Sequence, residues 1–343
     1  MLEKILLGTY TRRVSKGIHE IALDTEKGEL SKAELVVEGN GPTYLTLSKN
    51  GNLYSVIEMN GEGGAAAFKA AGDASYSLIN AVTEEGAPHC YVAVDEDRQL
   101  LYGANYHRGM VYSYQITEDG GLKLADKVTH DEETGPHENQ NSAHVHYTDL
   151  TPDGRLVVCD LGTDRVYTYD VDAKGALTEV AKYVAEPGTG PRHLVFHPNE
   201  TSAYLFGELD STVTVLDYNA ADGSFKQSQK LSTLPDGYNE FNGGAAIRIS
   251  DDGRYLYASN RGHNSIAVFS VTPEGRSVER IQLISTEGDF PRDFALNASG
   301  EYLVAANQNT DNLTLYSRDQ DSGLLTMIQK DVYAPECVCV RFQ

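Results

Sequence analysis

The sequence predicts an all-β protein: a closed seven-bladed β-propeller of four-stranded antiparallel blades. Three observations indicate it. A strand–turn–strand phrase recurs along the 343 residues, the turns carry Asn-Gly, Asp-Gly and Ser-Gly, and one copy of the phrase is split between the chain ends. Seven units average about 49 residues each, the length of one four-stranded blade. We therefore expect a single propeller domain over residues 1–343.

Six copies of the phrase are complete, each with an alternating strand, a polar turn and a second apolar strand. They begin at Gly41, Gly86, Ser142, Gly190, Gly243 and Phe290. A third strand follows, such as GMVYSYQI or DRVYTYDV, and then a more polar fourth strand such as GLKLADKVT. The periodicity of two along these segments is typical of strands, and no long stretch has helical periodicity.

The seventh blade combines both ends of the chain. PECVCVRF at the C-terminus supplies its first strand, and KILLGTY and GIHEIAL near the N-terminus supply the next two. Pairing of the two ends closes the ring and removes an exposed sheet edge. Two smaller β domains are the alternative, but they do not explain why the C-terminal phrase is a truncated copy.

Composition excludes several classes of function. The formal net charge is −22, so we expect repulsion from nucleic acid and from anionic membranes. No apolar stretch is long enough for a membrane span, and the N-terminal apolar run is too short for a signal peptide, so we expect a cytoplasmic protein. The four cysteines show neither zinc spacing nor a disulfide framework. Nothing in the sequence indicates an oligomeric state.

The repeat register selects candidate site residues, because the first strand of each blade lines the central channel. Residues at one repeat position then form a ring around the axis. The ring near the start of the first strands is Thr43, His89, His146, Arg192, Ala245, Arg292 and Glu336. The ring at the end of the second strands is Tyr10, Glu58, Tyr106, Leu161, Glu208, Arg261 and Gln308.

Both rings are varied and rich in ionisable groups, whereas the positions between them stay apolar in every copy. The pocket is therefore predicted at this end of the blades. A locally cationic pocket in an acidic protein favours an anionic small-molecule ligand. A salt-bridge network between blades is the structural alternative. Two long blade junctions, residues 131–144 and 232–244, enter the same end and are candidates for further contacts.

Three motifs resemble one known family. They are GPHENQNSAHVH, GPRHLVFHPNE with YLFGELDSTV, and DDGRYLYASNRGHNSIAVFSV. The whole chain resembles the seven-bladed propeller lactonases, which include bacterial 6-phosphogluconolactonase and the fungal carboxymuconate cycloisomerases. The resemblance implies hydrolysis of a sugar-acid lactone, most often 6-phospho-D-glucono-1,5-lactone in the pentose phosphate pathway. Asn139 departs from the family loop, which often has arginine before the glutamine that is Gln140 here.

The functional cluster of the related cycloisomerases is a histidine, two arginines and a glutamate. Those roles fall on His146, Arg192, Glu208 and Arg261, the residues that the repeat register also selects. We expect these four to be catalytic, with either His146 or Glu208 as the general base. We expect substrate contacts from a further set: His144, Gln140, His89, Arg292 and Glu58. No G-x-S-x-G elbow indicates a nucleophilic serine.

His144 and His146 lie two apart in a predicted strand and so share one face. His-x-His is also a metal-binding spacing, and His137 or Glu138 is a possible third ligand. The matching positions in other blades are arginines, which repel a cation, so we predict no metal and no cofactor. The alternatives to this lactonase are a cycloisomerase or lactonase acting on a non-phosphorylated acid, and a propeller binding module without chemistry.

Overall fold

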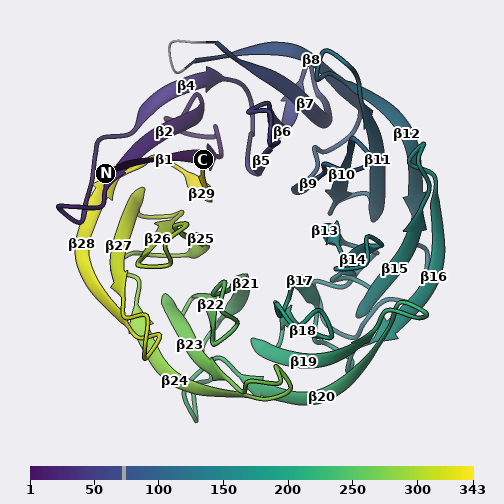
Figure 1. Ribbon diagram of the computed structural model, residues 1–343. Coiled ribbons are helices and arrows are strands. Elements are labelled where there is room, and N and C mark those ends of the chain that lie inside the picture. Colours follow the sequence, from purple (N-terminus) through teal and green to yellow (C-terminus); the bar gives the residue numbers. More distant parts are fainter. Residues whose placement is uncertain (72–74) are drawn as a thin grey trace.

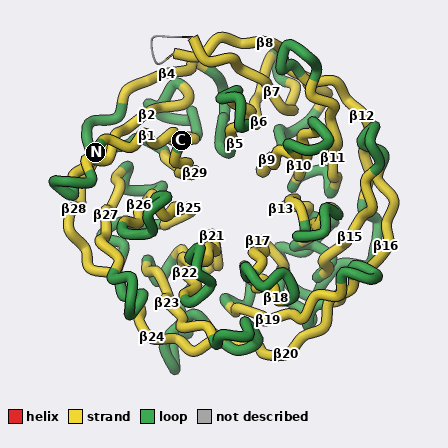
Figure 2. The backbone as a smooth tube through the Cα atoms, viewed as in Figure 1, coloured by secondary structure: helices red, strands yellow, loops and turns green. Residues whose placement is uncertain are grey.

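The computed structural model describes residues 1–71 and 75–343 as a ring of seven radial sheets around one axis (Figure 1). This arrangement confirms the predicted seven-bladed β-propeller. Strands, turns and loops make up the described residues, and Figure 2 shows no helix among them. Within that same part of the chain, no helix is long and apolar enough to cross a membrane.

Six blades take four consecutive strands each, ordered outward from the axis. The first is β5 (Leu45–Leu47), β6 (Leu53–Met59), β7 (Glu62–Ala71) and β8 (Ser75–Glu85). The second is β9 (Tyr91–Asp95), β10 (Leu100–Asn105), β11 (Met110–Ile116) and β12 (Leu122–Thr129). The third is β13 (Val145–Leu150), β14 (Leu156–Asp160), β15 (Arg165–Val171) and β16 (Leu177–Val184).

The other three blades follow the same order. The fourth is β17 (Pro191–Phe196), β18 (Ser202–Gly207), β19 (Thr212–Asn219) and β20 (Ser224–Ser232). The fifth is β21 (Gly243–Ile249), β22 (Tyr255–Arg261), β23 (Ser265–Val271) and β24 (Val278–Ser285). The sixth is β25 (Pro291–Leu296), β26 (Tyr302–Asn307), β27 (Asn312–Arg318) and β28 (Leu325–Tyr333).

The seventh blade closes the ring. Its innermost strand is β29 (Cys337–Phe342), which pairs antiparallel with β1 (Leu2–Thr9), and β1 pairs with β2 (Gly17–Asp24). The backbone N–H of Gln343 also donates to the carbonyl of Lys4 at 2.9 Å. The outer strand is broken into β3 (Glu29–Leu30) and β4 (Glu34–Glu38), which both pair with β2. The pairing of the two chain ends is as predicted.

The hydrophobic core lies between neighbouring blades, because each sheet buries one face against the preceding sheet and the other face against the following sheet.

A repeated tyrosine in the second strand adds a hydrogen bond across the interface between blades. The hydroxyls of Tyr54, Tyr204 and Tyr257 donate to the carbonyls of Gly120, Gly275 and Gly323, at 3.1, 2.8 and 2.8 Å. Each acceptor lies in the outer hairpin of the following blade, so these bonds fix the angle between blades.

Candidate active site

A β-bulge places the inner-ring residues. The pairing register shifts between Val145 and Tyr147 in β13, between Pro191 and His193 in β17, and between Pro291 and Asp293 in β25. The residues that the ladder skips are His146, Arg192 and Arg292. A bulge leaves one residue unpaired and redirects its side chain. These three side chains line the axial cavity.

The strand register corrects the predicted inner ring in two blades. Tyr91 pairs with Ala104 as Tyr147 pairs with Cys159, so the residue that matches His146 is Cys90 and not His89. In the closing blade the ladder skips Val338, which takes the place that we assigned to Glu336. Both Cys90 and Val338 line the cavity. Sequence alignment on the turns missed these offsets because bulges and short first strands differ between blades.

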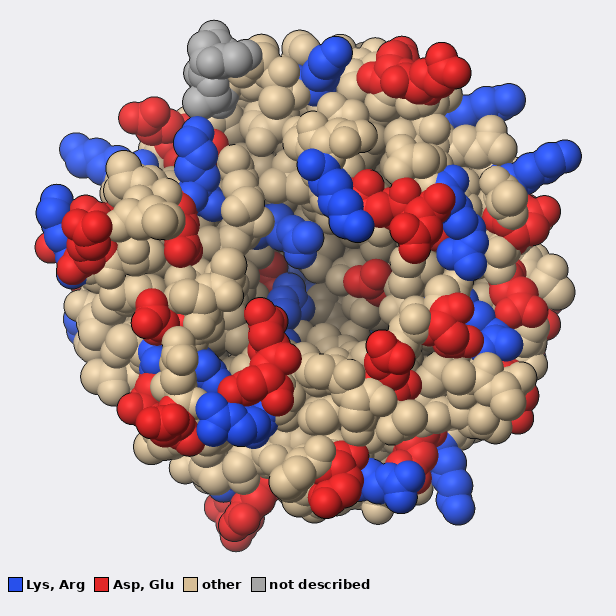
Figure 3. Space-filling view, in the orientation of Figure 1, with Lys and Arg blue, Asp and Glu red and all other residues tan. Residues whose placement is uncertain are grey.

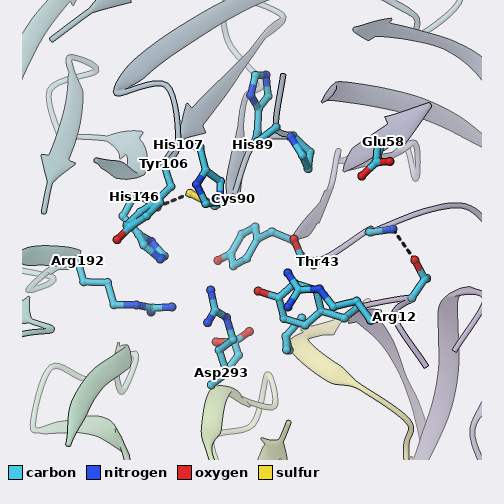
Figure 4. Close-up of a pocket in the computed structure, with 18 of the residues that line it drawn as sticks. Arg12, Thr43, Glu58, His89, Cys90, Tyr106, His107, His146, Arg192 and Asp293 are labelled. Carbon is cyan, nitrogen blue, oxygen red and sulfur yellow. Dashed lines mark hydrogen bonds between the residues drawn. The ribbon is translucent and has the colours of Figure 1, made fainter. Parts of the chain in front are cut away.

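The axial cavity has a volume of about 690 Å³, within the usual range for small-molecule sites. The skipped positions and the equivalent positions of the other blades contribute Thr43, Cys90, His146, Arg192, Arg292 and Val338 to its wall. The ends of the second strands contribute Tyr10, Glu58, Tyr106, Glu208 and Arg261. Figure 4 shows His146 and Arg192 on one side of the cavity, with Glu58 and Arg12 on the other. The cavity is thus lined by residues of both rings, with Cys90 and Val338 in the corrected inner ring.

Glu208 joins the two catalytic arginine candidates. Its Oε2 lies 2.8 Å from Arg192 Nε and 2.8 Å from Arg261 Nη2. The contact to Arg192 Nε is an ion pair without hydrogen-bond geometry. Burial raises the pKa of Glu208, but Arg261, Arg192 and Arg292 reverse this and hold the pKa below its usual value. Glu208 is therefore an ionised, weakly basic carboxylate at neutral pH.

Backbone carbonyls clamp both guanidinium groups. Arg192 Nη1 donates to the Ala245 carbonyl at 2.6 Å, and Arg261 Nη2 donates to the Gly244 carbonyl at 2.8 Å. Burial, with the charge of Arg261, lowers the pKa of Arg192 to about 9, so the guanidinium remains charged at neutral pH. The two groups are fixed donors beside the cavity, which suits stabilisation of a developing oxyanion.

His146 is a neutral imidazole in this cationic setting. Its side chain is buried, and Nδ1 has no hydrogen-bond partner among the described residues. Burial and the charges of Arg192, Arg292 and Arg261 hold its pKa well below the usual range. The ring lies edge-on to Tyr106 at 5.8 Å and to His193 at 5.2 Å between centroids. His146 is therefore an uncharged imidazole at the cavity wall, and its lowered pKa makes it a weak base.

An aromatic layer forms the floor of the cavity, one residue further along the first strands. Tyr44 stacks on Tyr91 at 4.0 Å, Tyr91 contacts Tyr147 at 4.7 Å, and Tyr147 contacts His193 at 5.5 Å between centroids. A second cavity, of about 570 Å³, lies beyond Tyr44 and Tyr91. The view along the axis in Figure 3 shows the ring hollowed at its centre, with charged side chains of both signs inside. The floor therefore divides the channel into two chambers.

Two predicted substrate contacts do not line the cavity. His144 stacks on Tyr106 at 4.1 Å, and its Nδ1 lies 2.9 Å from the Tyr106 carbonyl, so it supports Tyr106 from behind. Gln140 accepts a hydrogen bond from the N–H of His137 and donates to the Leu161 carbonyl, which fixes the loop 131–144 to the end of β14. Neither long junction, 131–144 or 232–244, contributes a lining residue.

The other predicted contacts do line the cavity. Glu58 is exposed at its wall, and Arg292 is half-buried there. His89 reaches it but is buried, with Nε2 2.6 Å from the Tyr114 hydroxyl. Burial lowers the pKa of His89 to about 3, so it is neutral. His89 is thus held by the protein on the side away from the ligand space.

Sequence reasoning missed several lining residues, among them Arg12, His107, His193 and Asp293. His193 and Asp293 were detectable, because they directly follow the ring residues Arg192 and Arg292. Arg12 and His107 follow the second-strand ring by two and one residues, in loops that the repeat does not define. Within the described ranges, no group of three His, Cys, Asp or Glu side chains is arranged to hold a metal ion, and this includes His137 and Glu138.

Comparison with known proteins gives the family. Residues 4–342 match the family model described as "Lactonase, 7-bladed beta-propeller". An uncharacterized protein of Lactococcus lactis subsp. cremoris is 54% identical over 340 residues, covering 99% of each chain. The 6-phosphogluconolactonase of Bacillus subtilis is 40% identical over 341 residues, covering 98% of this chain and 97% of that protein.

One solved structure extends the comparison. The Pseudomonas aeruginosa protein PpgL, described as a periplasmic gluconolactonase, is 30% identical with a TM-score of 0.93, covering 100% of this chain and 99% of that chain. The match to the family model spans nearly the whole chain, and the cavity lies where both predicted rings meet. The protein belongs to the seven-bladed β-propeller lactonase family.

Proposed function

We propose that the protein hydrolyses 6-phospho-D-glucono-1,5-lactone to 6-phospho-D-gluconate, without a metal or cofactor, in the cytoplasmic pentose phosphate pathway. The observation that carries the proposal is the cluster in which Glu208 bridges Arg192 and Arg261 beside the neutral His146. The B. subtilis relative, named 6-phosphogluconolactonase, supports the choice of substrate. A cationic cavity in a protein of net charge −22 supports an anionic ligand.

In the proposed mechanism, His146 is the general base. It takes a proton from a water molecule whose oxygen adds to the lactone carbonyl carbon. Arg192 and Arg261 donate to the carbonyl oxygen as it becomes a tetrahedral oxyanion. The bond between the carbonyl carbon and the ring oxygen then breaks, and the protonated His146 returns its proton to the leaving alkoxide.

Glu208 has a supporting role in this mechanism. Its carboxylate lies between two guanidinium groups, and its Oε2 contacts both of them, whereas His146 makes no ion pair with any residue that the structure describes. It offsets part of the charge of Arg192 and Arg261 and holds both in place. This assignment divides the roles of His146 and Glu208, which the sequence alone leaves open.

A second candidate substrate is a non-phosphorylated aldonolactone such as glucono-1,5-lactone. The similarity to the P. aeruginosa protein described as a periplasmic gluconolactonase, at a TM-score of 0.93, supports this second substrate. The same cluster around His146 would open either ring, because the reacting lactone group is common to both molecules. The two candidates differ only in the distal phosphoryl group.

The test is a stopped-flow pH-indicator assay with freshly generated 6-phosphogluconolactone, run with and without EDTA. His146→Gln should lower kcat about 10²- to 10⁴-fold, the usual contribution of a positioned base. Arg192→Ala should lower kcat/KM by a similar factor because it removes an oxyanion donor. The matched control is His137→Gln, since His137 lies on the loop 131–144 and outside the cavity lining. Acid release by the unmodified protein at the spontaneous rate would refute the proposal.

A further inference from the structure

Two guanidinium groups lie against one aromatic ring at the cavity wall. The Arg12 Cζ is 4.1 Å from the centroid of Tyr10, and the Arg292 Cζ is 5.8 Å from the same centroid. Among the described residues, neither guanidinium makes a hydrogen bond or an ion pair, whereas Arg192 and Arg261 both contact Glu208. A cation–π contact positions a guanidinium but leaves its N–H groups available.

The loop that carries Arg12 is held by a buried carboxylate. Glu336 Oε1 accepts from the N–H groups of Arg12 and Arg13 at 2.9 and 3.0 Å. Its Oε2 accepts from Val14 and Ser15 at 2.8 and 2.9 Å. Glu336 is 2% exposed, and its own N–H donates to Asp311 Oδ1 at 2.8 Å. The backbone at Arg12 is therefore fixed, although the Arg12 side chain is exposed at the cavity mouth.

The charges around the cavity leave these two arginines unbalanced. Asp293 is paired with Arg248 at 2.8 Å, and Glu208 is shared by Arg192 and Arg261. Glu58 is the remaining carboxylate among the described lining residues, and it makes no ion pair there. Two guanidinium groups that contact one ring and have no carboxylate partner in the described part of the chain match a group that bears two negative charges, because each presents a planar fork of donors.

We propose that Arg12 and Arg292, arranged on Tyr10, form a subsite for the phosphomonoester group of the substrate, and that Glu336 is the positioning residue for Arg12. The inference rests on the proposed lactonase function. His146 and Arg192 lie across the cavity from Arg12 (Figure 4), whereas Arg292 is close enough to His146 and Glu208 for its charge to act on them. The distal phosphoryl group therefore lies on the Arg12 side of the reacting lactone. The subsite distinguishes phosphorylated from non-phosphorylated lactones.

The experiment compares KM and kcat for 6-phosphoglucono-1,5-lactone and glucono-1,5-lactone. The quantity compared is the ratio of KM for the phosphorylated lactone to KM for glucono-1,5-lactone. Arg12→Gln and Arg292→Gln should each raise this ratio about 10- to 100-fold, the usual effect of losing a charged hydrogen bond. Glu336→Gln should shift the same ratio in the same direction by a smaller factor, with kcat lowered less than KM is raised. The matched control is Lys16→Gln, a charge removed from the same loop but outside the lining. Lys16→Gln should leave the ratio unchanged.

Calorimetry separates this inference from the proposed function. 6-Phosphogluconate and gluconate are each titrated into the full chain, and the dissociation constants are compared. Thermal unfolding confirms that each variant is folded. Binding of 6-phosphogluconate that is tighter than binding of gluconate, with the difference lost in Arg12→Gln, supports the subsite. This holds even if neither lactone is turned over, and in that case only the proposed function fails. Equal loss for both ligands, or no loss for either, overturns the subsite even where turnover is intact.

Discussion

Replacement of Glu208 by glutamine tests the charge arrangement of the cavity most directly. The side chain of Glu208 is 20% exposed, and its Oε2 lies 2.8 Å from each of two buried arginines. With charge centres about 4 Å apart and an effective dielectric constant of about 20, each pair contributes about 4 kcal/mol of attraction. In the unfolded chain the Glu208 carboxylate is fully hydrated, and this hydration offsets part of the attraction. The variant leaves two buried cations facing each other, and breaking such a pair costs about 3–5 kcal/mol in the free energy of unfolding.

We expect Glu208→Gln to lower the thermal unfolding midpoint by about 4–7 °C at neutral pH, because the unfolding entropy of 343 residues is about 0.7 kcal/mol/K. The matched control is Glu58→Gln, because Glu58 lines the same cavity without an ion pair. Glu58→Gln should change the free energy of unfolding by no more than about 0.5 kcal/mol. Tens of millimolar phosphate should stabilise Glu208→Gln more than the unmodified protein, since the variant cavity has one more uncompensated positive charge. Equal midpoints for the two variants, with equal responses to phosphate, would refute the reasoning.

Two further predictions concern stability. Burial holds the pKa values of His146 and His193 well below their usual range, so the unfolded chain binds more protons below pH 6.5. Stability should therefore rise with pH up to about 6.5, and each histidine should cost about 2 kcal/mol at pH 5. Denaturant midpoints measured between pH 5 and 7.5 check this, and an unchanged slope in His193→Gln would contradict it. Tyr204→Phe removes the hydrogen bond to the Gly275 carbonyl and should cost about 1–2 kcal/mol, against no measurable cost for the exposed Tyr333→Phe.

The repeat explains why so much of the ring was predictable. Strand period, turn residues and the split phrase define the blades, and the end of each second strand follows directly, so Glu208 and Arg261 were found by position. The positions of the bulges were not predictable, because an unpaired residue in a strand leaves the hydrophobic pattern of the sequence unchanged. His89 was chosen in place of Cys90 for this reason.

Contacts between distant segments were also outside the reach of the repeat. Glu336 was predicted as a ring residue, but its carboxylate accepts backbone N–H groups from residues 12–15, more than 320 positions away in sequence. Nothing in the local pattern around Glu336 or Arg12 signals that contact. The support of Tyr106 by His144 is similar, since two loops from neighbouring blades have to meet before the stacking exists.

The closure of the seventh blade has a practical consequence. One short segment, Cys337–Phe342, completes both the last sheet and the ring, and it is held to β1 by hydrogen bonds and packing alone. A chain that ends before Pro335 would present the open edge of β1 as an acceptor. A synthetic peptide of residues 335–343 would then be the natural donor strand, and it would return Glu336 to the loop of Arg12. The last blade thus offers a site at which the protein can be divided into two complementing fragments, with recovered lactone turnover reporting their reassembly.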